Sequence, residues 1–240
     1  MEAKNISLKV YKSEDKTQNV LITVHGFAGD KESSVIDAIG KEMMKYGYDV
    51  IAFDLPCHGD DKKTGVLKLK DCRKYLEMVE KYVKKEYPNV PISYFATSFG
   101  GYLLLQYLNK SKINYNKIIL RAPAVYMAEV LREKILPEHN VELTDLKHIV
   151  NLGYGKELFV DYSFYKDLLK VKEKDLVSGE QLCIIQGKKD NIVEYKKNQQ
   201  FFEKYYNNKH RFYYFENADH RFKNAGELEK IVEIAKEILM

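Results

Sequence analysis

The sequence predicts an α/β protein in which a mostly parallel central β-sheet is flanked by helices on both faces. Short apolar runs alternate with segments of helical periodicity along most of the 240 residues. Several of these runs are continuously apolar, as expected for strands that are covered by helices on both sides. Right-handed crossovers between such strands build a parallel sheet.

Seven apolar runs are expected to form strands: 6–11, 20–25, 50–53, 92–96, 117–121, 182–186 and 212–215. Three of the intervening segments place their apolar residues on one helical face. These residues are Ile36, Ile39 and Met43 in the first segment, Cys72, Leu76, Val79 and Val83 in the second, and Leu228, Ile231, Ala235 and Ile238 in the third. We therefore expect strand and helix to alternate along most of the chain.

Residues 124–178 interrupt this alternation. The segment has no strand-like run and contains helix-like pieces rich in bulky side chains, among them Tyr126, Met127, Leu131, Ile135, Phe159, Tyr162, Phe164 and Leu168. It is too long for a plain connection in a compact domain, and long insertions are commonly functional lids. We interpret it as a helical cap inserted over one edge of the sheet; the alternative is a peripheral helical excursion.

Composition restricts the class of protein. The hydrophobic fraction of 45% is too high for a disordered chain, and the 39 basic and 35 acidic residues are interleaved, so no nucleic-acid partner is expected. No stretch is apolar enough to span a membrane, the first residues lack a signal-peptide core, and the three cysteines form no CxxC pair. We expect one cytoplasmic domain over residues 1–240.

The hexapeptide ATSFGG at 96–101 is the sharpest functional signal. It follows an apolar run and precedes a helix-like run at 102–108. A serine on a tight strand-to-helix turn needs small neighbours, which Ala96 and Gly100 supply, and the turn exposes its hydroxyl at a helix N-terminus. Ser98 is therefore the candidate nucleophile; the alternative is a serine that only caps the helix.

A second turn, HGFAG at 25–29, ends another apolar run. Such a turn can aim a backbone N–H into the crevice at the carboxyl edge of the sheet. The N–H groups of Phe27 and Phe99 could together hold an oxyanion, and each such donor contributes about 3–4 kcal/mol to acyl transfer. His25 itself is expected to hold the turn.

A serine nucleophile needs a base, and histidine with an orienting carboxylate supplies one. Asp190 and His220 follow the runs at 182–186 and 212–215, so the chain order is nucleophile, acid, base. Asp219 is a poor orienting acid because neighbours in an extended loop point apart, and Asp54 precedes the nucleophile. His58 is expected to lie in a structural turn.

These motifs together resemble the α/β-hydrolase fold serine hydrolases over almost the whole chain. The matching segments are HGF at 25–27, DLPCHG at 54–59 with cysteine where glycine is usual, ATSFG at 96–100, GKKDNIV at 187–193 and DH at 219–220. The spacing is most similar to the cinnamoyl and feruloyl esterases and the monoacylglycerol-lipase-like hydrolases. The resemblance implies a mostly parallel sheet of eight strands, of which seven are legible.

We therefore expect a carboxylic ester hydrolase that acts on a small-molecule ester through an acyl-enzyme on Ser98. An aromatic acyl group such as a hydroxycinnamate and a short fatty chain fit equally. Thioester hydrolysis, acyl transfer or a catalytically silent binding protein are the alternatives on the same fold. The sequence has no HExxH motif, Walker motif or GxGxxG loop, so no metal or cofactor is expected.

Overall fold

The computed structural model describes residues 6–61, 65–111 and 115–240. Its main sheet has seven strands in the order β1-β3-β2-β4-β5-β8-β9. Their bounds are β1 Leu8–Tyr11, β2 Asn19–Val24, β3 Tyr48–Phe53, β4 Ile92–Thr97, β5 Ile118–Arg121, β8 Leu182–Gly187 and β9 His210–Phe215. Only β1 pairs antiparallel in this sheet. All seven predicted strands are confirmed, and within the described residues this sheet has no eighth strand.

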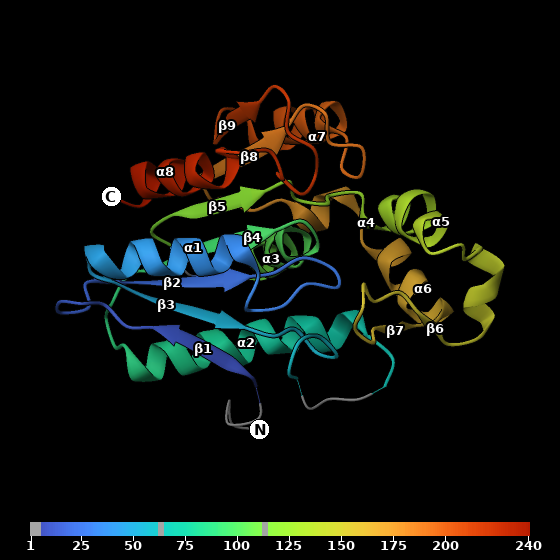
Figure 1. Cartoon of the computed structure of the whole chain (residues 1–240), viewed down its shortest axis with the longest axis horizontal. Coiled ribbons are helices and arrows are strands. Elements are labelled where there is room, and N and C mark those ends of the chain that lie inside the picture. The colour runs from blue at the N-terminus through green and yellow to red at the C-terminus, as the bar shows by residue number, and fades with distance from the viewer. Residues whose placement is uncertain (1–5, 62–64, 112–114) are drawn as a thin grey trace.

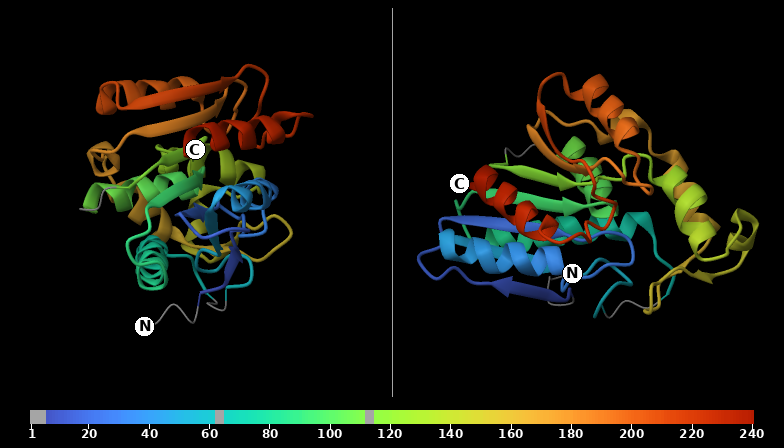
Figure 2. Two further views of the ribbon diagram at one scale, coloured as in Figure 1. Left: turned by 90° about the vertical axis from the view of Figure 1, so that its left-hand side faces the viewer. Right: turned by 45° about the horizontal axis from the view of Figure 1, so that its top comes forward.

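Helices cover both faces of the sheet, as predicted (Figure 1, Figure 2). One face packs against α1 (Ser34–Met43), which continues into a short 3₁₀ turn, η2 (Met44–Tyr46), and against α8 (Glu227–Leu239). The other face packs against α2 (Leu69–Glu86), α3 (Phe99–Lys110) and α7 (Tyr195–Tyr206). The predicted apolar helical faces point into these two cores. Alternate residues of a strand face opposite cores: Phe95 lies toward α1 and α8, and Ala96 toward α2 and α3.

The segment between β5 and β8 is mostly helical. It comprises α4 (Met127–Val130), a π-helical turn η3 (Leu131–Ile135), α5 (Leu136–Glu138), η4 (Leu143–Lys147), β6 (Val150–Asn151), β7 (Phe159–Val160), α6 (Tyr162–Lys170) and η5 (Glu173–Leu176). The expectation that it holds no strand is wrong, because β6 and β7 form an antiparallel pair. Strands of two residues show no periodicity in the sequence.

The position of this segment follows from the direction of the strands. The parallel strands point toward α4, α5, α6 and the β6–β7 pair, so the segment lies beyond their carboxyl ends (Figure 1). In open α/β sheets that edge is where ligands bind. The structure therefore places the insertion beside the candidate site.

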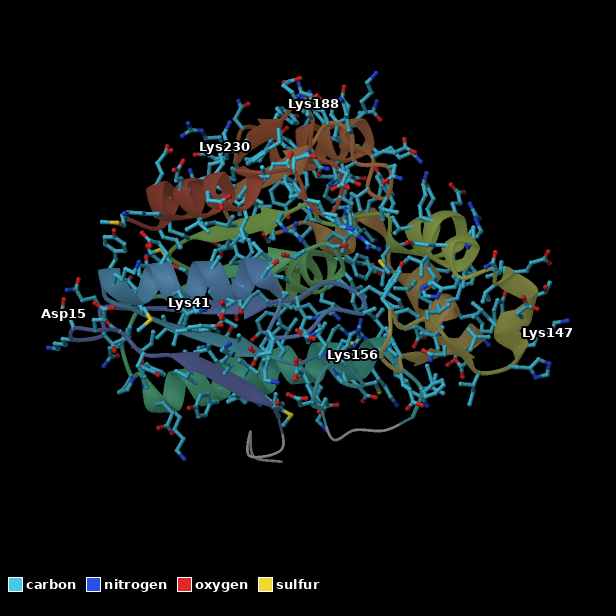
Figure 3. The ribbon with its side chains drawn as sticks, in the orientation of Figure 1. Asp15, Lys41, Lys147, Lys156, Lys188 and Lys230 are labelled. Carbon is cyan, nitrogen blue, oxygen red and sulfur yellow. The ribbon has the colours of Figure 1, made fainter. Side chains whose placement is uncertain are left out.

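Charged side chains of both signs extend from many elements over the surface, as the labelled residues illustrate (Figure 3). Several lysines pair with nearby carboxylates: Lys41 with Asp37 at 2.6 Å and Lys188 with Glu216 at 2.6 Å. Within residues 6–61, 65–111 and 115–240, no helix is long and apolar enough to cross a membrane.

Candidate active site

Ser98 occupies the sharp turn between β4 and α3. Its φ of 51° and ψ of −115° lie in a region that residues other than glycine rarely adopt. Such a conformation costs about 1–3 kcal/mol and persists only where the surroundings enforce it. Its N–H donates to the carbonyl of Arg121 at 2.9 Å, and its carbonyl accepts from the N–H groups of Tyr102 and Ala124, both at 3.1 Å. Neighbouring backbone on both sides thus holds the turn.

The small residues around Ser98 are required by close backbone approach. A Cβ at Gly100 would lie 2.4 Å from the carbonyl oxygen of His25 and 2.5 Å from that of Val24. A Cβ at Gly26 would lie 3.3 Å from the Cβ of Ser98. Glycine at these positions therefore lets the sharp turn at Ser98 (here called the elbow) meet the turn at 25–29, at the ends of the adjacent strands β4 and β2.

The structure brings the predicted nucleophile, base and acid together. Ser98 Oγ lies 3.0 Å from His220 Nε2, and His220 Nδ1 lies 2.8 Å from Asp190 Oδ2. Asp190 is in the loop after β8, and His220 is in the loop after β9. With its proton on Nδ1, His220 donates to Asp190 and accepts from Ser98, which leaves Nε2 able to take the serine proton.

Asp190 is fixed by a buried polar network. Its Oδ1 accepts from the N–H groups of Ile192 at 2.9 Å and Val193 at 2.7 Å, and Oδ2 accepts from Gln186 Nε2 at 3.2 Å. Asn198 on α7 donates to Gln186 Oε1 at 2.9 Å and to the carbonyl of Pro123, also at 2.9 Å. Gln186 and Asn198 are fully buried. Sequence reasoning missed both: Gln186 is a polar residue near the end of an apolar strand, and Asn198 stands among lysines and glutamines, where it gives no signal.

His25 has a structural role, as expected. Its Nδ1–H donates to the carbonyl of Gly26 at 2.8 Å, and Nε2 accepts from the N–H of Leu55 at 3.0 Å. These two bonds require the neutral ring, and burial lowers the pKa of His25 to about 4. His58 lies beside it, bonded to the carbonyl of Pro56 at 2.9 Å, and burial lowers its pKa to about 3.

The other candidate acids are engaged elsewhere. Asp219 Oδ1 accepts from the N–H groups of Arg221 and Phe222, both at 2.8 Å, so its carboxylate closes its own loop. Asp54 accepts from the N–H of Lys31 at 2.8 Å and from its Nζ at 2.8 Å. It also accepts from the N–H of Asp60 at 2.9 Å. Because Lys31 lies in the loop before α1, Asp54 joins that loop to the DLPCHG turn.

The two N–H groups proposed for an oxyanion lie at the starts of neighbouring turns. Phe99 is the first residue of α3, and the first N–H groups of a helix have no partner within it. In the part of the chain that the structure describes, neither the Phe27 nor the Phe99 N–H has a hydrogen-bond partner. The side-chain rings of Phe27 and Phe99 meet edge to face, with their centroids 5.9 Å apart.

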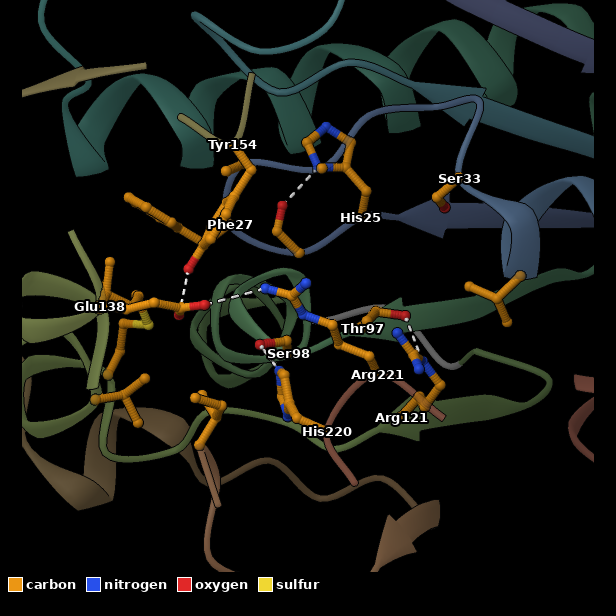
Figure 4. A pocket seen from close by; sticks show the side chains of 18 residues that line it. His25, Phe27, Ser33, Thr97, Ser98, Arg121, Glu138, Tyr154, His220 and Arg221 are labelled. Carbon is orange, nitrogen blue, oxygen red and sulfur yellow. Dashed lines mark hydrogen bonds and ion pairs between the residues drawn. The ribbon is translucent and has the colours of Figure 1, made fainter. Parts of the chain in front are cut away.

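A pocket of about 330 Å³ opens over Ser98 and His220 (Figure 4). The segment 124–178 contributes an apolar wall to it through Met127, Val130 and Ile135. The same segment also contributes two polar residues, Glu138 and Tyr154, which sequence reasoning missed.

These two polar residues connect the insertion to the loop that carries His220. Glu138 Oε1 pairs with Arg221 at 3.3 Å, and its Oε2 accepts from the Tyr154 hydroxyl at 2.6 Å. The Arg221 guanidinium also lies over the Tyr154 ring, 5.1 Å from its centroid. Because Arg221 follows His220 directly in the chain, the insertion is tied to the loop of the base. Among the described residues, no group of three or more His, Cys, Asp or Glu side chains is placed to hold a metal.

Comparison with known proteins gives the family. Residues 15–151 match the model of the family described as serine aminopeptidase, S33, a match that covers more than half of the chain. This chain belongs to that family of α/β-hydrolase serine hydrolases. The matched region includes Ser98 and ends before Asp190 and His220.

Solved structures of the same fold align with nearly the whole chain. Est1E from Butyrivibrio proteoclasticus, with ferulic acid bound, has a TM-score of 0.83 at 19% identity, over 99% of this chain and 96% of that one. Alpha/beta hydrolase domain-containing protein 10 from mouse has a TM-score of 0.75 at 17% identity, over 100% and 96% of the two chains. These likenesses confirm the predicted fold.

Proposed function

We propose that this serine hydrolase cleaves carboxylic esters through an acyl-enzyme on Ser98. The observation that carries the proposal is the continuous hydrogen-bonded chain from Ser98 through His220 to Asp190. Each member of this chain comes from a different loop at the carboxyl edge of the sheet. A serine beside an oriented histidine is an activated nucleophile.

In the proposed reaction, His220 Nε2 takes the proton from Ser98 Oγ as the oxygen attacks the acyl carbonyl. The N–H groups of Phe27 and Phe99 hold the resulting oxyanion. His220 then gives the proton to the leaving alcohol. Water next attacks the acyl carbon with His220 again as base; the bond to Ser98 Oγ breaks, His220 returns the proton to Oγ, and the carboxylic acid leaves. Asp190 keeps the ring oriented in both steps.

We propose that residues 124–178 act as a cap that selects the acyl or alcohol group. Their apolar side chains Met127, Val130 and Ile135 line the pocket with Ser98. A largely apolar wall of this kind accommodates an aromatic or a short aliphatic group. The ferulic acid in Est1E makes aromatic acyl esters a natural first choice for testing.

Amide hydrolysis is the second candidate, because the matching family is described as aminopeptidases. An aminopeptidase needs an acceptor for the substrate ammonium group. Glu138 is the carboxylate that the insertion places in the pocket, and Arg221 and Tyr154 already occupy it. The ester reaction is therefore favoured, and a panel of 4-nitrophenyl esters, thioesters and aminoacyl 4-nitroanilides compares the three reactions directly.

The nucleophile is tested by labelling the purified protein with a fluorophosphonate and mapping the adduct by mass spectrometry. We expect one adduct on Ser98, absent in Ser98→Ala and strongly reduced in His220→Ala. Ser163→Ala is the matched control, because that hydroxyl lies in the insertion, where it donates to Asp161. Normal ester turnover by a folded Ser98→Ala protein would overturn the proposal.

A further inference from the structure

Arg121 brings a positive charge into the pocket that the proposed reaction does not use. It ends β5, and its Cα is paired in register with that of Thr97, next to the nucleophile. Ile119, two residues earlier, belongs to the core beneath α1 and α8, so the Arg121 side chain projects from that same face. There it lines the pocket together with Ser98, Thr97 and Ser33.

The guanidinium has more donors than partners. Of its five N–H donors, the one on Nε donates to Thr97 Oγ1, at 3.4 Å. The Phe222 ring covers one face of the group at 5.1 Å, and within residues 6–61, 65–111 and 115–240 the Nη donors have no hydrogen-bond partner. Asp190 and Asp219 attract the charge from a distance, but within the described part of the chain no carboxylate forms an ion pair with it. Burial lowers its pKa to about 10, so it stays charged at neutral pH.

The other charged groups of the pocket are balanced. Arg221 pairs with Glu138, and Asp190 is bonded to His220, Gln186 and two N–H groups. The Ser33 hydroxyl, which lines the same pocket, makes no capping bond at the start of α1. In Figure 4, Arg121 and Ser33 lie on the opposite side of Ser98 from Glu138. The pocket therefore has an apolar wall formed by Met127, Val130 and Ile135, with the Glu138–Arg221 ion pair also on the side of the insertion. The Arg121 cation lies on the opposite side of Ser98.

We propose that Arg121 forms an anion-binding subsite beside Ser98, so that the preferred substrate is an ester carrying a carboxylate or phosphate group. The planar fork of a guanidinium fits both oxyanions. The apolar wall would receive the other part of the substrate. This inference rests on the proposed ester hydrolysis and adds its substrate class.

The test compares anionic esters with neutral analogues of similar size. At the acyl end, 4-nitrophenyl hydrogen adipate is compared with methyl 4-nitrophenyl adipate. At the alcohol end, 4-carboxyphenyl butyrate and 4-(phosphonooxy)phenyl butyrate are compared with 4-(methoxycarbonyl)phenyl butyrate. The measured quantity is the ratio of kcat/KM for each anionic ester to that for its neutral partner. Comparing this ratio between variants removes the intrinsic reactivity of the esters.

We expect Arg121→Gln to lower this ratio about 10- to 100-fold for at least one anionic ester, the usual effect of losing a charged hydrogen bond. Arg121→Lys should retain part of the preference for the anionic ester. Arg211→Gln is the matched control, because it removes a cation that lies over Tyr213 outside the pocket. The ester that responds identifies the end of the substrate and the oxyanion that is recognised.

A second substitution tests the subsite without removing Arg121. Ser33→Asp adds a carboxylate to the pocket wall, and Ser33→Asn adds a neutral side chain of the same shape; both residues are good N-caps, so the fold should tolerate them. The ratio should fall in Ser33→Asp alone. Unchanged ratios in folded Arg121→Gln and Ser33→Asp proteins would refute the subsite while ester hydrolysis stands. Failure of the wild type to hydrolyse any ester or to be labelled on Ser98 would overturn both proposals.

Discussion

Two buried neutral histidines make the fold sensitive to mild acid. Burial holds the pKa of His25 at about 4 and that of His58 at about 3, against an ordinary value of 6.5. Below about pH 6.5 the unfolded chain therefore binds protons that the folded chain does not, and stability falls as the pH drops. At about 1.36 kcal/mol per pH unit, each histidine removes about 2 kcal/mol between neutral pH and pH 5.

The substitution His25→Gln isolates one of these contributions. Urea unfolding of wild type and variant at pH 7 and pH 5 gives the loss in free energy of unfolding for each protein. The loss should be smaller in His25→Gln by about 2 kcal/mol, because the variant has one fewer histidine that charges only when unfolded. His148→Gln serves as the control, since His148 is exposed. Equal losses in wild type and His25→Gln would show that His25 titrates normally in the folded protein and refute the reasoning.

Three further substitutions test the site and its supports. Asp190→Asn should lower kcat for 4-nitrophenyl butyrate by roughly 1,000- to 10,000-fold through loss of the His220 tautomer, whereas Asp219→Asn should change it by less than about threefold; similar rates for the two would exclude Asp190 as the orienting acid. Gly100→Ala should cost at least about 2 kcal/mol in urea unfolding, because its Cβ meets backbone oxygen at 2.4 Å, whereas Gly179→Ala has open space and should be nearly neutral. Glu138→Gln should change the free energy of unfolding by less than about 1 kcal/mol, since the ion pair of Glu138 with Arg221 is half exposed. The same substitution should alter KM, because it loosens the insertion. An unchanged KM would count against a cap.

The elements predicted well from the sequence are those with one environment along their whole length. The strands β2, β3 and β4 are buried at nearly every position, so each is visible as a mostly apolar run without alternation. The elbow was also legible, because its geometry demands small residues at fixed positions, as the backbone contacts at Gly100 show. Steric limits and burial therefore determine directly which residue types occur at these positions.

Other features depend on contacts between distant segments and leave little trace in the sequence. The β6–β7 strands are two residues each and pair across a loop, so no periodicity predicts them. Arg121 stands at the end of an apolar run like an ordinary boundary residue, and its role is visible only once Ser33 and Ser98 line the same pocket. The network that holds Asp190 reaches Asn198 only through Gln186, so it depends on where the fold brings α7 to the end of β8.

The wide separation of Ser98 and His220 has a consequence for biosynthesis. The two residues are 122 positions apart, and His220 reaches the serine only after β9 has paired with β8. A nascent chain leaving the ribosome amino end first can complete the strands around the elbow long before the histidine has been translated. In the proposed mechanism, the serine therefore has no proton acceptor during most of synthesis, and products of premature termination before residue 220 should be inert toward esters.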